Sequence, residues 1–320
     1  MEITAVSKRF KVAAAHASPL LLDKEKTLEK VCVLIADGGA QGVRLIGFPE
    51  TFVPGYPYWL GLYPPISQMA ALNEYSNQSV VMSGPDLDGV KAACARYKVN
   101  VVLGVSERDG GTLYNSQVYI SESGELVGVH RKLQPTMSER TVWGQGDGST
   151  LKVFDLPVGK VGGLICGEHS MNLARHALIL QHEQIHVSAW PTFATMKGRE
   201  AWFDPHVDAL SKVHAYTGAC FVIVAQDPIS QHNLDRIEQM LGHQDVLSAG
   251  GARSAIYGPR EDLMAPAHTG PEERLVVAEI DLDLIQAAKI MHDSAGHYAR
   301  AEVLRLVIDT ESKTPLIVRP

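Results

Sequence analysis

The sequence has few cysteines and no long hydrophobic run. Among its 320 residues, no two cysteines form a Cys-x-x-Cys pair, so common zinc and dithiol motifs are excluded, and a disulfide scaffold is not expected at this length. No segment approaches the roughly 20 apolar residues of a membrane helix. An apolar stretch near the N-terminus is broken by His16 and Pro19, which argues against a secretory signal. We therefore expect a cytoplasmic protein whose thiols stay free to react.

The chain also lacks an excess of positive charge. Its 29 basic and 36 acidic residues give a net charge of −7, which offers no general attraction to phosphate backbones or anionic lipid. We predict neither a nucleic-acid partner nor a membrane partner. With 45% hydrophobic and 20% charged residues, the composition is that of a globular protein, and the absence of repeats and long linkers favours a single domain over residues 1–320.

Several common catalytic motifs are missing. The sequence contains no Walker loop, no Gly-x-Ser-x-Gly and no Gly-x-Gly-x-x-Gly, so nucleotide cofactors are not indicated. Four of the thirteen histidines crowd residues 169–186. Helical spacing would place His182 and His186 on one face, but no partner pattern completes a recognisable metal site. We interpret these residues as ordinary surface or partly buried histidines and predict no metal.

Short β-branched runs alternate with helical periodicity, which predicts an α/β fold. A turn-rich gap at 121–124 indicates an antiparallel hairpin, so the sheet is predicted to be mixed. The predicted strands cover 11–17, 43–48, 99–105, 114–120, 126–130, 158–165, 185–190, 220–226, 254–257 and 275–280. The predicted helices lie around 28–35 and over 87–98, 170–181, 199–217 and 282–291.

Three predicted strands are followed by a reactive side chain: Glu50, Lys132 and Cys166. Open α/β folds place their sites at the carboxyl edge of the sheet. Burial there would raise the pKa of Glu50 towards that of a usable base, and a helix beginning after Cys166 would favour a thiolate. A base, a cation and a nucleophile form a complete set for acyl-type chemistry. The ordinary alternatives are a turn cap, a solvated lysine and a small buried cysteine.

At these residues the sequence resembles the nitrilase superfamily, the carbon-nitrogen hydrolases, whose triad is Glu-Lys-Cys. The resemblance extends from residue 11 to residue 300. A Trp-Gly-x-Gly-Asp-Gly loop at 143–148 and the tail at 296–300 favour the nitrilase branch over amidases, carbamoylases and ureidopropionases. Gly167 departs from the tryptophan that close nitrilase relatives often carry, which would open the pocket wall. The matching strings are FPETF (48–52), PGYPYW (54–59), HRKL (130–133), PT (135–136), ER (139–140), CGEH (166–169) and GHYAR (296–300).

The resemblance implies a four-layer αββα sandwich with two mixed β-sheets, and neither a metal nor an organic cofactor. It also implies homodimers formed across the helix after Cys166, or larger spiral homo-oligomers, with 282–320 as a C-terminal extension in subunit contacts. By the same resemblance Glu50 is the base, Lys132 stabilises the tetrahedral intermediates and Cys166 is the nucleophile. Glu139 is the second acid, which orients Lys132 or the substrate; its alternative is a surface ion pair with Arg140 or another cation.

The expected activity is that of a nitrilase, which hydrolyses an organic nitrile with water to a carboxylic acid and ammonia through a cysteine thioimidate and a thioester. An amidase or N-carbamoyl amide hydrolase with the same three residues remains an alternative, as does a non-catalytic binding or scaffold protein that keeps the fold. Aromatic side chains could surround the organic group of the substrate or form ordinary core. The predicted pocket residues are Tyr56, Trp143, Gly167, Trp190 and Phe193.

Overall fold

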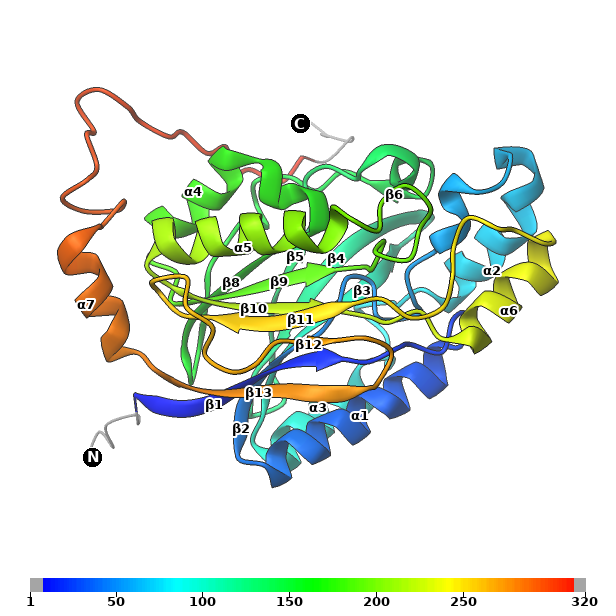
Figure 1. Ribbon diagram of the computed structural model, residues 1–320, viewed down its shortest axis with the longest axis horizontal. Coiled ribbons are helices and arrows are strands. Elements are labelled where there is room, and N and C mark those ends of the chain that lie inside the picture. Colours follow the sequence, from blue (N-terminus) through cyan, green and yellow to red (C-terminus); the bar gives the residue numbers. More distant parts are fainter. Residues whose placement is uncertain (1–7, 314–320) are drawn as a thin grey trace, which may run out of the picture.

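Two mixed β-sheets form the centre of the molecule. The computed structural model describes residues 8–313 (Figure 1). The first sheet has the strand order β13-β1-β2-β3-β4-β5, with β6 beside β4, and the second has the order β12-β11-β10-β9-β8-β7. The strands of the first sheet are β1 (Arg9–His16), β2 (Val43–Gly47), β3 (Asn100–Asp109), β4 (Thr112–Ile120), β5 (Leu126–Arg131), β6 (Trp143–Gly144) and β13 (Arg274–Asp281). Those of the second are β7 (Phe154–Leu156), β8 (Gly159–Ile165), β9 (Ile185–Trp190), β10 (Phe221–Gln226), β11 (Arg253–Tyr257) and β12 (His268–Thr269).

Each sheet has three parallel strands at its centre and antiparallel strands at its edges. In the first sheet β1, β2 and β3 are parallel, and β4, β5 and β13 extend them in antiparallel pairs. In the second sheet β8, β9 and β10 are parallel, with β7 and β11 antiparallel to their neighbours. The mixed topology follows from the connections, since parallel neighbours need long helical crossovers whereas the hairpins need only turns.

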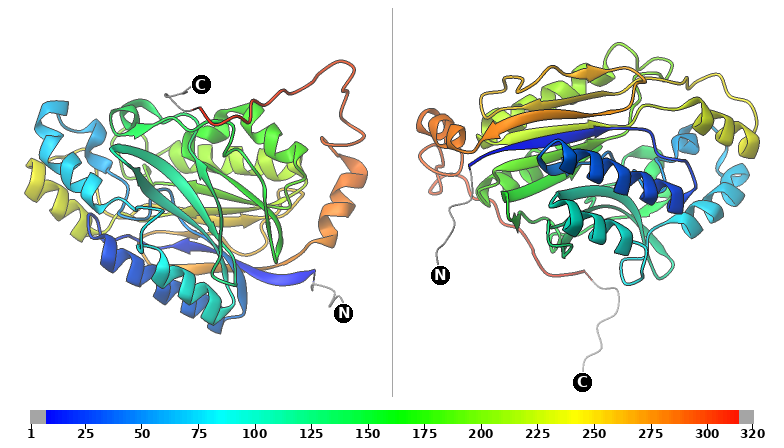
Figure 2. Two further views of the ribbon diagram at one scale, coloured as in Figure 1. Left: turned by 180° about the vertical axis from the view of Figure 1, so that it is seen from behind. Right: turned by 90° about the horizontal axis from the view of Figure 1, so that it is seen from below.

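Helices cover the outer face of each sheet. Helices α1 (Lys24–Ala40) and α3 (Asp88–Tyr97) pack on the first sheet, and α4 (Asn172–Leu180) and α5 (Phe203–Gly218) pack on the second (Figures 1 and 2). The inner faces of the two sheets share one apolar cluster. The predicted αββα sandwich is therefore confirmed.

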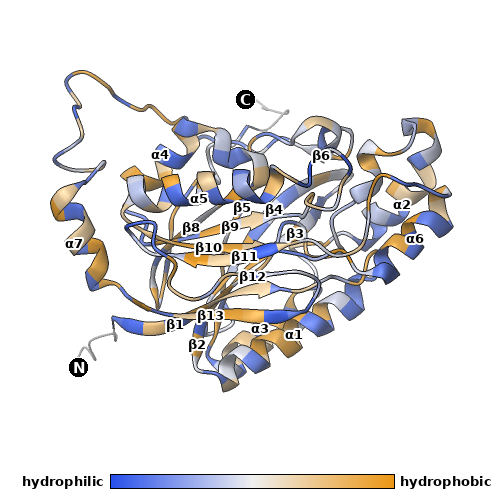
Figure 3. Ribbon diagram, in the orientation of Figure 1, coloured by the Kyte–Doolittle hydropathy of each residue, from blue (hydrophilic) through white to orange (hydrophobic). Residues whose placement is uncertain are grey.

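Strand β1 is buried on both faces of the first sheet. Its side chains alternate between the faces of the sheet, as the pleat requires. Val12 and Ala14 belong to the cluster between the sheets, whereas Ala13 and Ala15 belong to the cluster beneath α1 and α3. Strands buried on both faces read as continuous apolar runs. Figure 3 shows hydrophobic residues along the strands and many hydrophilic residues on α6.

Two helices that were not predicted from the sequence, α2 (Met69–Gln78) and α6 (Gln231–Leu241), lie side by side at one end of the molecule (Figures 1 and 2). The hydrophobic periodicity of α2 is weak, whereas α6 carries Leu234, Ile237 and Leu241 at helical spacing, a signal that the prediction did not use. α2 buries Ala71 and Tyr75, and α6 buries Leu234 and Ile237, in the cluster that also holds the loop after β2. Tertiary packing therefore stabilises both helices, but only α2 lacks a clear pattern in the sequence.

Two other predictions need correction. The helix expected over 199–217 begins only at Phe203, because the preceding residues form turns. The helical spacing proposed for His182 and His186 is wrong. His182 lies in a turn with a φ of 62°, and His186 lies on β9, so the two residues share no helix face.

The chain after α7 (Asp283–Met291) returns across the molecule to the helices of the second sheet (Figures 1 and 2). Leu306 and Ile308 pack against the cluster beneath α4, and the backbone N–H of Lys313 donates to Asp147 at 2.7 Å. The expected role of this segment in subunit contacts stays a prediction. Within residues 8–313, no helix is long and apolar enough to cross a membrane.

Gly104 on β3 allows the loop after β2 to approach the sheet. A Cβ at this position would overlap the carbonyl oxygen of Pro49 and lie 2.8 Å from the backbone nitrogen of Thr51. We expect Gly104→Ala to lower the free energy of unfolding by about 1–3 kcal/mol, because the backbone must move. Thermal unfolding measures the effect. Gly111→Ala is the control, since nothing lies within 4 Å of its Cβ position; equal stability of the two variants would contradict this account.

Candidate active site

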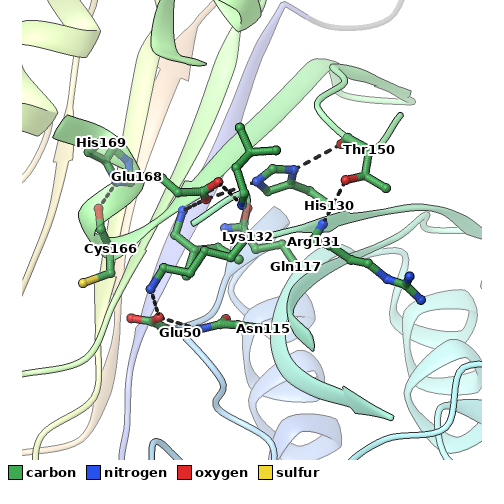
Figure 4. Close-up of polar contacts among 12 residues, drawn as sticks. Glu50, Asn115, Gln117, His130, Arg131, Lys132, Thr150, Cys166, Glu168 and His169 are labelled. Carbon is green, nitrogen blue, oxygen red and sulfur yellow. Dashed lines mark hydrogen bonds and ion pairs between the residues drawn. The ribbon is translucent and has the colours of Figure 1, made fainter. Parts of the chain in front are cut away.

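The carboxyl ends of β2, β5 and β8 meet at one cleft, and each presents one of the three predicted residues (Figure 4). β5 runs in the same direction as β2, because β3 lies parallel to β2 and two antiparallel pairings follow. Glu50 and Lys132 therefore leave the first sheet at the same edge. Cys166 follows β8 in the second sheet. The cleft thus forms where the edges of the two packed sheets meet.

Lys132 lies between two carboxylates. Its Nζ is 2.6 Å from Oε1 of Glu50 and 2.7 Å from Oε2 of Glu139, and all three residues are buried. The amide of Asn115 on β4 donates to Oε1 of Glu50 at 2.6 Å. The other oxygen of Glu50, Oε2, has no hydrogen-bond partner among the described residues. That oxygen is available to accept a proton from a reacting group.

The thiol of Cys166 lies beside both carboxylates. Its Sγ and one carboxylate oxygen each from Glu50 and Glu139 all lie within 4.8 Å of one another. The backbone of Cys166 is left-handed, with a φ of 50°, as the chain turns from β8 into the 3₁₀ helix η4 (Cys166–Ser170). Sparsely populated backbone conformations of this kind cluster at functional sites. The turn directs the thiol into the cleft.

Burial sets the protonation states of the site. Burial raises the pKa of Glu50 to about 7, although the Lys132 cation opposes the shift and the Glu139 charge adds to it. This agrees with the sequence-based prediction. Burial lowers the pKa of Lys132, but the two carboxylates raise it more, so its pKa lies above the usual value and the amine stays charged.

Burial outweighs the effect of the helix start that was expected to favour a thiolate at Cys166. Burial raises the pKa of the Cys166 thiol well above its usual value, and the Glu50 charge raises it further, while Lys132 and the Gly167 amide oppose the shift. A helix terminus cannot offset the loss of solvation of a fully buried sulfur. The thiol is therefore protonated at rest, and a base must remove its proton during attack.

Glu168 joins the loop of Cys166 to the loop of Lys132 (Figure 4). Its Oε1 accepts from the backbone N–H of Leu133 at 2.7 Å, and its Oε2 accepts from the backbone N–H of Ile165 at 2.9 Å. His130 donates to the same oxygen at 3.1 Å. Burial lowers the pKa of His130, but the Glu168 carboxylate outweighs it and the net pKa is raised. A buried ion pair thus fixes β5 relative to β8.

Glu139 belongs to the site and is not a surface partner of Arg140. It lies on the 3₁₀ helix η3 (Met137–Thr141) and is only 3% exposed. Its Oε2 accepts from the backbone N–H of Thr136 at 2.7 Å, and its Oε1 accepts from the hydroxyl of Tyr56 at 2.9 Å. These contacts orient the carboxylate towards Lys132. The alternative of a surface ion pair is therefore wrong.

A cavity of about 390 Å³ opens onto Cys166 and Glu139. Four of the five predicted pocket residues line it: Tyr56, Gly167, Trp190 and Phe193. The fifth, Trp143, does not. Its ring packs behind Tyr56 at a centroid distance of 6.1 Å, and its Nε1 donates to Ser106. The lining also includes residues that the sequence analysis did not name, among them Tyr58, Thr136, Met196, Arg199, Trp202 and Phe203.

Asn115 also escaped the sequence analysis. It lies within the predicted strand over 114–120, and the only available signal was a polar residue in an otherwise apolar run. The sequence does not show which face of the strand it occupies. Its function becomes visible only when β4 pairs with β5, which places Asn115 opposite the end of β5, where its carbonyl accepts from the Lys132 N–H.

Two clusters of potential metal ligands occur among the described residues, and hydrogen bonds already occupy both. In the first, Glu50, Glu139 and Cys166 surround the ammonium of Lys132, which would repel a cation. In the second, Glu183 accepts a hydrogen bond at 2.8 Å from each of His186 and His214. The Lys132 ammonium in the first cluster and the two histidine–carboxylate hydrogen bonds in the second take up carboxylate lone pairs that a metal would need. Neither arrangement fits a metal centre.

Comparisons with known proteins agree with this architecture. The profile of the carbon-nitrogen hydrolase family matches residues 11–290. The chain belongs to the carbon-nitrogen hydrolase family. It is 38% identical to a nitrilase from Pseudomonas syringae pv. syringae over 310 residues, which cover 97% of this chain and 92% of that protein. It is 35% identical to an aliphatic nitrilase from Rhodococcus rhodochrous, over 96% of this chain and 84% of that protein. An arylacetonitrilase from Aspergillus niger is 36% identical, over 96% of this chain and 91% of that protein.

Solved structures show the same fold at lower sequence identity. A carbon-nitrogen hydrolase from Helicobacter pylori aligns with a TM-score of 0.68 and 18% identity, covering 89% of this chain and 93% of that chain. Nit3 from Saccharomyces cerevisiae aligns with a TM-score of 0.66 and 20% identity, covering 89% and 95%. The family member described here is accordingly a hydrolase of carbon-nitrogen bonds.

The raised pKa of Glu50 predicts how activity depends on pH. A base must be ionised to accept a proton, so kcat/KM should rise with pH through an apparent pKa near 7. This apparent value describes Glu50 in its interacting surroundings and not an isolated carboxyl group. The folded state binds the Glu50 proton more tightly than the unfolded state, so the same group makes stability fall as pH rises from 4.5 to about 7.

Asn115→Ala should move this acidic limb to higher pH by about one unit, because the hydrogen bond that favours the ionised carboxylate is lost. The control is Asn100→Ala. Asn100 is an equally buried asparagine at the start of β3. Its side-chain amide donates to the backbone carbonyl oxygen of Arg44 and to the carboxylate of Glu122. The assignment of the acidic limb of kcat/KM to Glu50 would be contradicted if Asn115→Ala left that limb at the same pH. A wild-type limb near pH 4 would also contradict it.

Proposed function

We propose that this carbon-nitrogen hydrolase is a nitrilase, which converts an organic nitrile to the carboxylic acid and ammonia. The observation that supports the proposal most directly is the buried cleft in which the Cys166 thiol lies beside Glu50 and Glu139. Lys132 lies between the two carboxylates. Relatives named as nitrilases match nearly the whole chain at 34–38% identity. The proposed substrates are a small-molecule nitrile and water.

In the first step, Cys166 Sγ attacks the nitrile carbon. Oε2 of Glu50 takes the thiol proton as the carbon–sulfur bond forms and passes it to the nitrile nitrogen, which leaves a covalent thioimidate and an ionised Glu50. Because the thiol pKa is raised and that of Glu50 is about 7, proton transfer to Glu50 must accompany attack. The charge that develops on the nitrogen lies near the Lys132 ammonium, which stabilises it.

In the second step, water replaces ammonia. Glu50 takes a proton from a water molecule as the water oxygen adds to the thioimidate carbon, and passes this proton to the nitrogen. The hydroxyl of the tetrahedral intermediate then gives its proton to the nitrogen through Glu50, so that ammonia leaves and a thioester remains. A second water, activated in the same way, cleaves the carbon–sulfur bond and releases the carboxylic acid, while the proton returns to the sulfur. The Lys132 ammonium stabilises both tetrahedral intermediates. Glu139 keeps Lys132 oriented and charged.

The shape and chemistry of the cavity favour an aromatic or arylaliphatic organic group. Rings surround the approach to the thiol: Tyr56 and Tyr58 each contact Phe193, with centroid distances of 5.6 and 5.7 Å. Phe193 in turn contacts Phe203 at 5.3 Å. Edge-to-face contacts of this kind form walls that accept a further ring. A cavity of this volume is also at the lower end of the range for small-molecule sites.

Subunit association is part of the proposal. Exposed apolar side chains lie on the helices that cover the second sheet: Leu173 on α4, and Val213 and Tyr216 on α5. A homodimer formed across these helices would remove them from water. Further exposed apolar residues follow α7, at Tyr298, Val303 and Leu304, and fit the proposed role of the C-terminal extension in larger homo-oligomers.

We also propose a cytoplasmic location.

Ammonia release from nitriles tests the proposed function. The purified enzyme should release ammonia from phenylacetonitrile, and parallel assays with phenylacetamide should show far less, because an amidase would prefer the amide. Cys166→Ala should fold normally and lose activity by at least about 10⁴-fold, since no nucleophile remains. Intact mass should show a covalent adduct on the wild type alone. Equal turnover by Cys166→Ala, or hydrolysis of the amide only, would refute the proposal.

Gly167 sets the space beside the nucleophile. A Cβ at this position would lie 2.6 Å from Oγ1 of Thr136, which also lines the cavity. We expect Gly167→Trp to lower kcat/KM for phenylacetonitrile about tenfold or more relative to acetonitrile, because the larger side chain takes up pocket volume. Steady-state assays with both nitriles measure the ratio. Gly61→Ala is the control, since its nearest neighbour is 3.8 Å away; an equal loss for both nitriles in Gly167→Trp would contradict this account.

A further inference from the structure

A chain of buried polar side chains lies behind Cys166 and outside the cavity. It consists of His169 on η4, Glu183 in the turn before β9, His186 on β9 and His214 on α5, and each is at most 2% exposed. Gly162 on β8 provides the space for this chain, because a Cβ there would overlap Oε1 of Glu183. The proposed chemistry uses none of these four side chains.

The four residues form one continuous path of contacts. Nδ1 of His169 is 2.9 Å from the backbone carbonyl oxygen of Cys166, and its Nε2 is 3.0 Å from Nε2 of His186. Nδ1 of His186 is 2.8 Å from Oε1 of Glu183, and Oε2 of Glu183 is 2.8 Å from Nε2 of His214. The path therefore joins the backbone of the nucleophile to a buried carboxylate. Figure 4 shows its first contact, from His169 to Cys166.

The hydrogen bonds along this path require one more proton than neutral histidines carry. A carbonyl oxygen only accepts, so Nδ1 of His169 carries a proton. The ionised Glu183 also only accepts, so Nδ1 of His186 carries a proton. If both rings were neutral, two lone pairs would face each other across 3.0 Å. A further proton between the rings removes this repulsion, and His186 then donates from both nitrogens.

Ser188 does not remove the need for this proton. Its Oγ accepts from Nε1 of Trp190 at 2.7 Å and lies 2.9 Å from Nε2 of His169 and 3.3 Å from the hydroxyl of Ser211. The single hydroxyl proton of Ser188 can reach His169, but Nε2 of His186 would still face that nitrogen without a proton. Trp190 lines the cavity, so the same serine connects the path to the pocket wall.

The protonation states of the neighbours assign the extra proton to the Glu183–His186 pair. Burial lowers the pKa of His169 well below its usual value and lowers that of His214 to about 4, so both are neutral near pH 7. Burial raises the pKa of Glu183, but His186 and His214 outweigh it and hold the value at about 2. An ionised carboxylate beside a protonated imidazole leaves the pair without net charge.

Other titratable groups around the path do not compensate for its proton. Arg175 on α4 adds a positive charge that opposes protonation of His169 and His214. Burial raises the pKa values of Tyr119 on β4 and of Cys220 beside β10, so both are uncharged near neutral pH. Lys289 on α7 acts on Cys220. Glu183 is therefore the anion that stabilises the extra proton.

We propose that this path is a proton-dependent support for the nucleophile and that His169 is a positioning residue. The hydrogen bond from His169 holds the Cys166 carbonyl while the Cys166 backbone keeps its left-handed conformation, which costs energy for a residue with a Cβ. Loss of the shared proton at high pH would push the His169 and His186 rings apart and release the carbonyl. The thiol would then leave its productive position.

A first experiment detects the proton without any assay of activity. Histidine-selective ¹⁵N labelling should show two imidazoles with both nitrogens protonated at pH 7.5. One is His130, which faces the Thr150 carbonyl and the Glu168 carboxylate. The other is His186, and its signals should disappear in His186→Gln. His16→Gln is the matched control, because His16 is another buried histidine, bonded to Ser254 and the Gly270 carbonyl.

A second experiment measures kcat against pH for a nitrile and therefore rests on the proposed function. Glu183→Gln should move the basic limb of kcat to lower pH by at least one unit, because the carboxylate that stabilises the extra proton is gone. His186→Gln should abolish that limb, since its amide supplies a donor to His169 that does not titrate. His169→Ala should lower kcat on the order of 100-fold with KM nearly unchanged. His16→Gln and Glu122→Gln should leave the profile unchanged.

The outcomes separate this inference from the proposed function. Absence of nitrile hydrolysis would refute the proposed function, while the labelling experiment would still decide the proton count. Only one doubly protonated imidazole in the wild type would overturn the inference, as would an equal loss of kcat at every pH in Glu183→Gln. A stoichiometric metal ion in the purified protein, with loss of activity on chelation, would also overturn it. If Glu183→Gln does not fold, the labelled wild type provides the answer.

Discussion

The site depends on the burial of one ammonium between two carboxylates. Taking charges out of water costs several kcal/mol for each ion, and only close contacts offset that cost. Lys132 meets Glu50 at 2.6 Å and Glu139 at 2.7 Å, so no member of the group is stable in the interior without the others. The same group sets the chemistry. It leaves Glu50 with a pKa of about 7, between the values of a carboxylate in water and a buried acid.

The two sheets hold this group in place. Glu50 and Lys132 leave the first sheet, Cys166 leaves the second, and Glu168 bonds to the backbone of both loops. Left-handed residues occur at Cys166 itself, at Thr51 beside Glu50 and at Met137 beside Glu139. Backbone strain of this kind persists only where the surroundings fix the chain. The rigid sandwich therefore allows each loop to take a conformation that the loop alone would not adopt.

The buried histidines behind the cleft differ in their protonation. His130 faces a carbonyl and a carboxylate, so it must donate from both nitrogens. His169 faces a carbonyl and another ring, so its protonation depends on its neighbour. The crowded histidines were interpreted from the sequence as ordinary surface or partly buried residues, but His169 and His186 are fully buried, and His182 and His186 share no helix face. Fully buried hydrogen-bond networks are strong only when every donor and acceptor is satisfied.

The sequence by itself determined the layered α/β class, most strands, and the positions of Glu50, Lys132 and Cys166 at strand ends, because apolar periodicity and strand termini are local features. It did not predict α2, whose few apolar residues gain stability only from packing, and the helical spacing of Leu234, Ile237 and Leu241 in α6 was not recognised. Nor could it separate Trp143, which lies behind the cavity, from Trp190, which lines it. Tertiary structure alone placed Asn115 on Glu50 and raised the pKa of the thiol, because burial and distance between remote segments arise only when the two sheets pack.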